Sequence, residues 1–321
     1  MTSSSAKRQR TEDAPIARSE IWHDDGSLVL QAENTQFRVH WGVLSLNSPF
    51  FQNLKGLPQP PDQPSIEGCP VVELPDDAAD VEYLLKALYI PTFLMQKKLP
   101  FPAAAALIRL GRKYDFKDVL NTTVERVTFE NPATLEKYDA LIVDRGRYGP
   151  RSILNYPGIL YDMLSLAREH SIMSVLPCAY YRAILYQPTL IFDGTPRGDG
   201  TSTVLATIDQ RRCVQGREKL IKAQFRVGYT HAWVRDRERL DCIDSEGCDT
   251  LRARLLDRFL DTLSLWALCG PTVELDTTVK QLCHSCATYA RESMESGRKK
   301  IWDELPSFFD LPPWSELTND L

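Results

Sequence analysis

The sequence predicts an α+β fold in which a small sheet flanked by helices is followed by an all-helical C-terminal domain. Apolar and polar residues alternate over residues 27–41, helical spacing takes over from Gly42, and helical stripes dominate after residue 135. At 321 residues, the chain is long enough for two domains with separate cores. We expect three parts: a disordered basic leader over residues 1–19, the mixed domain over 20–135, and a helical domain with a cysteine cluster over 136–321.

The first elements are a hairpin and a helix. Residues 27–33 (SLVLQAE) and 35–41 (TQFRVHW) alternate around Asn34, as two half-buried strands joined by a tight turn do. The apolar residues after Gly42 fall close to helical spacing, and Pro49 limits how regular that helix is. The Pro-rich residues 57–64 cannot continue a helix and predict a solvated loop.

The front part continues with a short strand and further helices. Residues 71–74 (VVEL) predict a strand, and the cap-rich turn at residues 76–80 leads into a helix that buries an apolar stripe. A second helix over residues 103–114 carries another stripe, and spaced valines after it continue the pattern.

These segments together form a recognisable pattern, consisting of Asp25 before the first strand, FRVHWGVLSLNSPFF (37–51), VVELPDD (71–77), YLLKALY (83–89) and LGRKYDFKDVL (110–120). The region from Asp25 to about residue 135 resembles a BTB/POZ domain, specifically the basidiomycete fungal type, and the resemblance extends more loosely through residues 297–317. It implies a protein-interaction module or adaptor that binds a partner protein, commonly a second copy of itself as a homodimer. It also implies no catalytic residues in this module.

The chain departs from the family pattern in three places. Many relatives carry Lys or Arg after the His40 position, pairing with the equivalent of Asp25, whereas this chain has Trp41. Residues 1–20 lack the helical periodicity that strand-swapped dimers need, and residues 91–102 lack the acidic residue typical of ubiquitin-ligase adaptors. We therefore do not predict binding to a ubiquitin-ligase scaffold. The expected interface is the apolar face of the first helix, formed by Trp41, Leu44, Leu46 and Phe50.

Helical stripes characterise the second half. Residues 159–177 predict one helix, and Pro177 ends or kinks it. The helical pattern resumes briefly over residues 178–188. Residues 193–202 (DGTPRGDGTS) form the expected loop. Two further helices are expected, over residues 250–268 and 277–300.

The cysteines give the sharpest chemical signal. Cys242 and Cys248 lie in a Gly- and Asp-containing loop, and Cys283 and Cys286 form a C-x-x-C at the head of a helix. Zn²⁺ favours four soft ligands at about 2.3 Å, so this set predicts a structural zinc site that pins the loop to the last helix. His284 is the alternative metal ligand.

Other uses of these cysteines remain open. Free thiols packed as small apolar groups are the simplest alternative. A thioredoxin-like redox motif is less favoured because no βαβ pattern accompanies it. Disulfides are less favoured again because the N-terminus lacks a secretory signal.

Composition and motifs exclude several classes of function from the prediction. The net charge of −5 and the pI of about 5.7 give no global attraction to nucleic acid or anionic membrane. Apolar runs fall short of the roughly 18 residues that a membrane helix requires. No H-E-x-x-H, G-x-S-x-G, G-x-G-x-x-G or Walker motif occurs, and His40 is expected to make a structural hydrogen bond at the strand-to-helix corner. The sequence therefore predicts no enzyme.

Two basic segments suggest further roles. Residues 7–10 (KRQR) are either a nuclear import signal or a solvated tail, so we expect the protein in the nucleus, the cytoplasm or both. Residues 211–239 combine cations with aromatic rings, which gives the alternative of a nuclear, nucleic-acid-associated regulator. The acidic residues between those cations favour a salt-bridged helical face.

Overall fold

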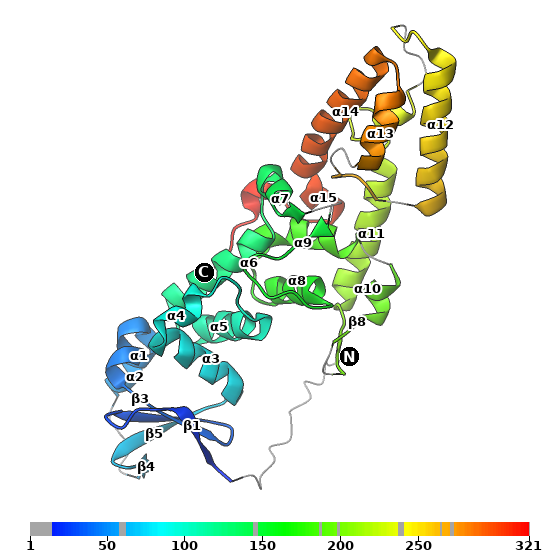
Figure 1. Cartoon of the computed structure of the whole chain (residues 1–321). Coiled ribbons are helices and arrows are strands. Elements are labelled where there is room, and N and C mark those ends of the chain that lie inside the picture. The colour runs from blue at the N-terminus through cyan, green and yellow to red at the C-terminus, as the bar shows by residue number, and fades with distance from the viewer. Residues whose placement is uncertain are drawn as a thin grey trace. The chain divides into compact units, whose positions relative to one another are not determined.

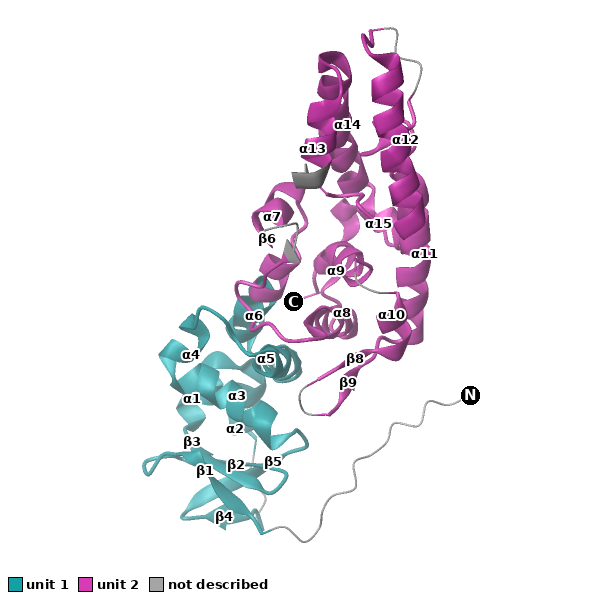
Figure 2. Ribbon diagram, turned by 45° about the vertical axis from the view of Figure 1, so that its right-hand side comes forward, with its two compact units in different colours: residues 1–125, 321 teal, residues 126–320 magenta. Residues whose placement is uncertain are grey.

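The structure, a computed structural model, describes residues 15–57, 62–143, 147–185, 188–197, 200–236, 241–263, 265–269 and 273–320. The chain divides into two compact units, residues 1–125 with residue 321 and residues 126–320 (Figure 2). The division falls within helix α6 (Lys117–Glu130), whereas the sequence placed it at residue 135.

Unit 1 contains a mixed sheet with the strand order β1-β3-β2-β5-β4. Its strands are β1 (Ala17–Trp22), β2 (Leu28–Ala32), β3 (Thr35–Val39), β4 (Ser65–Ile66) and β5 (Cys69–Leu74). The expected hairpin is confirmed, because β2 and β3 pair antiparallel with Leu30 opposite Phe37. Strand β5 runs parallel to β2, and β1 runs parallel to β3.

Two expectations about this sheet need correction. Residues 17–19, assigned to a disordered leader, begin the edge strand β1, whose only described strand neighbour is β3. Strand β2 was expected to be half-buried, yet Leu28, Val29 and Leu30 are all buried because β2 lies in the middle of the sheet. Residues 1–14, including the basic stretch 7–10, lie outside the described residues.

The helices of unit 1 gather on one side of this sheet (Figure 1). They are α1 (Trp41–Asn47), α2 (Pro49–Lys55), α3 (Ala78–Tyr89), α4 (Pro91–Met95), α5 (Phe101–Lys113) and the first part of α6. The helix expected after Gly42 divides at Ser48, whose Oγ accepts a hydrogen bond from the Phe51 N–H and caps α2. Asp77 caps α3 in the same way, as its cap-rich turn predicts.

Unit 2 is mainly helical. Its helices are the end of α6, α7 (Leu135–Ala140), α8 (Ile159–Glu169), η2 (Met173–Val175), α9 (Leu176–Ala183), α10 (Thr189–Asp193), α11 (Thr207–Ala223), η3 (Ala232–Val234), α12 (Ser245–Thr262), α13 (Val273–Gln281), α14 (His284–Asp303), α15 (Leu305–Phe308) and η4 (Trp314–Glu316). Two small antiparallel pairs accompany them, β6 (Ile142–Val143) with β7 (Arg147–Tyr148) and β8 (Thr195–Pro196) with β9 (Ser202–Thr203). The region expected to be all-helical therefore contains short strands.

Two expected helices of this unit are broken. The helix over residues 159–177 ends at Glu169, and Ser171 adopts a positive φ of 51°. Pro177 does not end a helix but lies in the first turn of α9, where no backbone N–H is needed. The helix expected over residues 277–300 is likewise two helices, because Cys283 takes an extended conformation between α13 and α14.

Candidate functional site

The structure brings the four predicted metal-ligating cysteines together. The Sγ atoms of Cys242, Cys248, Cys283 and Cys286 all lie within 4.8 Å of one another. The Cys242 and Cys283 sulfurs are 3.8 Å apart, well beyond the roughly 2.0 Å of a disulfide bond, and all four thiols are free. Such a group could bind a metal ion.

Helix starts position these side chains. Cys242 precedes α12, whose N-cap residue Asp244 accepts a hydrogen bond from the Gly247 N–H, and Cys248 follows in the first turns of that helix. Cys283 is the N-cap residue of α14, and Cys286 lies one turn further on. The break between α13 and α14 therefore places both cysteines of the C-x-x-C beside α12.

The cluster lies at the margin of an apolar core. Cys248 and Cys286 are buried with residues such as Leu255 and Leu282, while Cys242 and Cys283 are half-buried. The backbone N–H of Cys283 donates a hydrogen bond to the Cys248 sulfur at 3.3 Å. His284, the alternative ligand, is exposed and is not part of the group.

The electrostatics of the cysteines differ. The pKa of Cys283 is lowered to about 6, chiefly by the nearby backbone N–H of Cys286. The Cys283 side chain makes no capping hydrogen bond of normal geometry, so this effect is the electrostatic attraction of the α14 N-terminus. Burial raises the pKa of Cys248 and of Cys286. Burial therefore opposes ionisation of Cys248 and Cys286, whereas the backbone at the start of α14 favours it at Cys283.

The expected interface residues separate into two kinds. Trp41 and Leu44 are buried, with exposed fractions of 9% and 0%, whereas Leu46 is 85% and Phe50 42% exposed. The assignment of Trp41 and Leu44 to an exposed apolar face is therefore corrected: they belong to the core. Leu46 and Phe50 remain available to a partner. Helical spacing separates Leu46 from Trp41, because five residues along α1 turn the side chain by about 140° to another face, and Phe50 lies on a different helix.

A polar corner joins the start of α1 to the sheet. The His40 Nε2 lies 3.1 Å from Asp25 Oδ1, and the His40 backbone N–H donates to the Tyr89 hydroxyl at 2.8 Å. The hydrogen bond from the His40 side chain is the main cause that lowers the pKa of Asp25. His40 thus makes the structural contact expected of it, and its side chain pairs with the Asp25 carboxylate.

The comparison with protein families decides the identity of unit 1. Residues 24–128 match the BTB/POZ domain. This segment is a BTB/POZ domain. No curated protein matched the chain. BTB/POZ domains generally mediate contacts between proteins, including homodimerisation, and generally are not enzymes.

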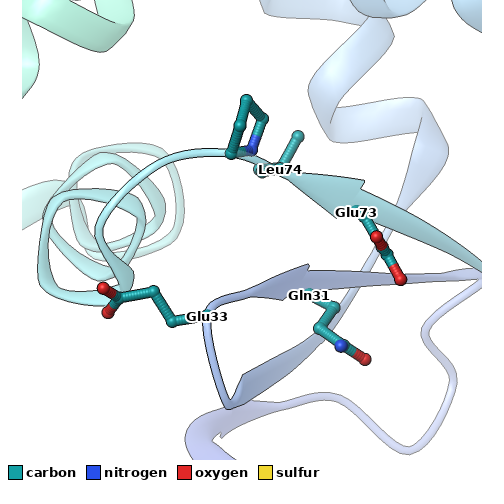
Figure 3. Close-up of a pocket in the computed structure, with 5 residues that line it drawn as sticks. Gln31, Glu33, Glu73 and Leu74 are labelled. Carbon is teal, nitrogen blue, oxygen red and sulfur yellow. The ribbon is translucent and has the colours of Figure 1, made fainter. Parts of the chain in front are cut away.

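The BTB/POZ domain has a shallow pocket at the end of β2 and β5 (Figure 3). Gln31 and Glu73, which pair across these strands, line it with Glu33 of the following turn. The Glu33 carboxylate already accepts a hydrogen bond from the Ala78 N–H at the start of α3. With a volume of about 170 Å³, the pocket is smaller than the roughly 300 Å³ at which ligand sites begin.

The basic and aromatic segment beyond the BTB/POZ domain does not expose its rings together. Trp233 is fully buried, Phe225 packs against the core, and the Tyr229 hydroxyl donates to Glu304 at 2.6 Å. Residues 237–240, including Arg237 and Arg239, lie outside the described residues.

Two of the described cations of this segment pair with acidic neighbours. Lys219 contacts Asp310 at 2.6 Å, and Lys222 contacts Glu218 along helix α11. The Lys222–Glu218 pair, four residues apart on α11, is a contact of the kind that the interleaved charges favour. Among the described residues, no helix is long and apolar enough to cross a bilayer.

Proposed function

We propose that the protein is a non-enzymatic adaptor that uses its BTB/POZ domain to bind a partner protein, including a second copy of itself. The observation that carries this proposal is the family match over residues 24–128, together with an exposed apolar pair on the first two helices. Leu46 and Phe50 lie four residues apart, on α1 and α2 respectively. A single exposed leucine is ordinary, whereas an exposed leucine and an exposed phenylalanine on successive helices supply apolar surface of the kind that interfaces bury.

The solution mass of the full chain tests self-association. Light scattering over a range of concentrations should give the mass of a dimer, and Leu46→Glu should shift it toward the monomer because the variant places a charge in the apolar contact. Met95→Glu is the matched control, since Met95 is 78% exposed in the same unit but lies on α4. A monomeric wild type, or equal masses for wild type and Leu46→Glu, would contradict this interface.

We further propose that Cys242, Cys248, Cys283 and Cys286 hold one structural Zn²⁺. In a tetrahedron with metal–sulfur bonds of about 2.3 Å, neighbouring sulfurs lie about 3.8 Å apart, and the Cys242 and Cys283 sulfurs are separated by 3.8 Å. A set of four thiolates suits Zn²⁺ better than hard cations such as Mg²⁺ or Ca²⁺. Such an ion would join the start of α12 to the start of α14.

Elemental analysis of the purified full chain tests this site. After expression with sufficient metal, about one equivalent of zinc is expected, and less than about half an equivalent would contradict the site. The double variant Cys283→Ser/Cys286→Ser should lose the zinc. Cys269→Ser is the control, because Cys269 is a partly exposed cysteine of the same unit outside the cluster.

We also propose that the basic stretch at residues 7–10 directs nuclear import and that the protein is of the basidiomycete fungal type. The composition of the stretch and the looser resemblance over residues 297–317 support these two points. A fluorescent fusion of the full chain should lose nuclear enrichment when Lys7, Arg8 and Arg10 become alanine. Equal distribution of the two fusions would contradict the import role.

A further inference from the structure

A buried guanidinium touches the four-cysteine cluster. Arg252 lies on α12 with 1% of its surface exposed, and its Nη2 donates a hydrogen bond to the Cys286 sulfur at 2.9 Å. Its Nη1 donates to the Asp236 carbonyl at 2.6 Å and lies 3.3 Å from an Asp249 carboxylate oxygen. The guanidinium is therefore fixed in one position, directed at a cysteine that is itself fully buried.

The burial of this cation requires a negative charge nearby. Removing a guanidinium from water costs several kcal/mol unless a good partner compensates it. Asp249 supplies part of that compensation, but its side chain is 39% exposed and the contact is long. A neutral thiol is a weak acceptor, whereas a thiolate accepts a charge-assisted hydrogen bond.

A metal-bound set of four thiolates provides that negative charge. Four thiolates around one divalent cation carry a net charge of minus two, which a neighbouring arginine partly neutralises. The N-terminus of the 20-residue helix α14 favours the same negative charge from the other side, at Cys283 and Cys286. Groups that donate hydrogen bonds to metal ligands orient them and adjust the strength of binding.

We infer that Arg252 is the positioning residue of this metal site: its hydrogen bond fixes the position of the Cys286 sulfur, so that the cluster binds one thiophilic divalent ion with all four sulfurs. This inference rests on the proposed zinc site and extends it, because it names the residue outside the ligand set on which affinity depends. Arg252 does not contact the metal. It acts through the Cys286 sulfur.

The variants separate charge, hydrogen bonding and packing. Arg252→Met keeps the length of the side chain but removes the charge and the donors, and Arg252→Lys keeps the charge. Arg254→Met is the matched control, because Arg254 is an exposed arginine on the same helix. If Arg252→Met fails to fold, Arg252→Gln takes its place.

Two measurements on the full chain test the inference. Competition with a chromophoric chelator should show zinc affinity about 10- to 100-fold weaker in Arg252→Met, less reduced in Arg252→Lys, and unchanged in Arg254→Met. In protein loaded with Co²⁺, the sulfur-to-cobalt charge-transfer band should move to lower energy in Arg252→Met, because loss of the hydrogen bond raises the energy of the sulfur electrons. A purely packing role would leave that band in place.

The outcomes distinguish the two proposals. If the wild type binds zinc and gives the four-thiolate cobalt spectrum, but Arg252→Met matches it in affinity and band position, the inference about Arg252 is wrong and the zinc site stands. If the wild type binds neither ion through sulfur, the zinc site is wrong, and the role of Arg252 is wrong with it. Weaker binding with a shifted band in Arg252→Met alone, relative to Arg254→Met, supports both.

Discussion

The two units differ in what their cores contain. Among the described residues, the buried polar side chains of unit 1 are Gln36, Ser48 and Thr123, none of them charged. Unit 2 buries Glu130, Asn131, Asp162, Arg182, Thr203, Asp209, Gln224, Thr230, His231 and Arg252. Apolar burial is non-directional and responds little to pH or metal, whereas a buried charge depends on its partner. Unit 2 should therefore respond to metal, and to acid more strongly than unit 1.

Metal removal should produce the largest difference between the responses of the two units. Structural zinc contributes on the order of 10 kcal/mol in zinc-finger peptides, so a strong chelator should loosen α12, α13 and α14. Hydrogen exchange of the full chain measures this. Exchange should rise over residues 245–262 and 273–303 and stay constant over 28–39. Equal exchange of residues 245–262 and 273–303 with and without the chelator would contradict this difference between the units.

Loss of a buried carboxylate should be the next largest effect. Glu130 accepts hydrogen bonds from the Arg151 N–H at 2.9 Å and the Ser152 hydroxyl at 2.6 Å, and it also accepts from the Tyr148 hydroxyl. Glu130→Ala leaves these donors unpaired in the interior and should cost about 3–5 kcal/mol. Denaturant unfolding checks this, with the exposed Glu169→Ala as the control. A cost below about 1 kcal/mol would show that water replaces the carboxylate.

In unit 1, the corresponding test removes apolar volume. Leu44→Ala should cost about 2–5 kcal/mol because Leu44 is fully buried. Leu46→Ala, two residues along the same helix, should stay within about 0.5 kcal/mol because Leu46 is exposed. Denaturant unfolding of both variants gives the comparison. Equal costs would contradict the division of the predicted interface into core and surface residues.

A fall in pH should produce the smallest of these changes in stability, and this change too should occur in unit 2. His231 is fully buried, and burial lowers its pKa from 6.5 to about 4, against the opposing hydrogen bond from Nε2 to the Trp266 carbonyl. Because the unfolded chain binds this proton at higher pH than the folded chain does, stability falls as pH drops from about 6.5 toward 4. The loss should reach roughly 2 kcal/mol by pH 5.

His231→Gln isolates that contribution, because glutamine retains a donor and does not titrate. The difference in unfolding free energy between wild type and variant should shrink or reverse as the pH falls from 7 to 5. A constant difference would show that His231 is protonated equally in both states.

Local sequence patterns predicted correctly the elements whose structure depends on residues close together in the chain. Alternating residues around a turn predicted the hairpin of β2 and β3. A capping residue predicted the start of α3 at Asp77, and helical spacing of apolar residues predicted α5. The edge strand β1 was missed because its sequence has weak alternation and its pairing with β3 is a long-range contact. The cysteine motif was placed at the head of a helix, as it is, but the helix expected over residues 277–300 ran through Cys283 because no Gly or Pro marks the break.

The sequence by itself determined the architecture of the front unit, its BTB/POZ resemblance and the four cysteines worth considering as ligands, because spacing and residue chemistry are local properties. Only the tertiary structure decided which face of α1 packs into the core, so that Trp41 is buried and Leu46 is exposed. It also placed Arg252 beside Cys286, which are 34 residues apart in sequence. That contact depends on how α12 packs near α14, and no periodicity encodes it.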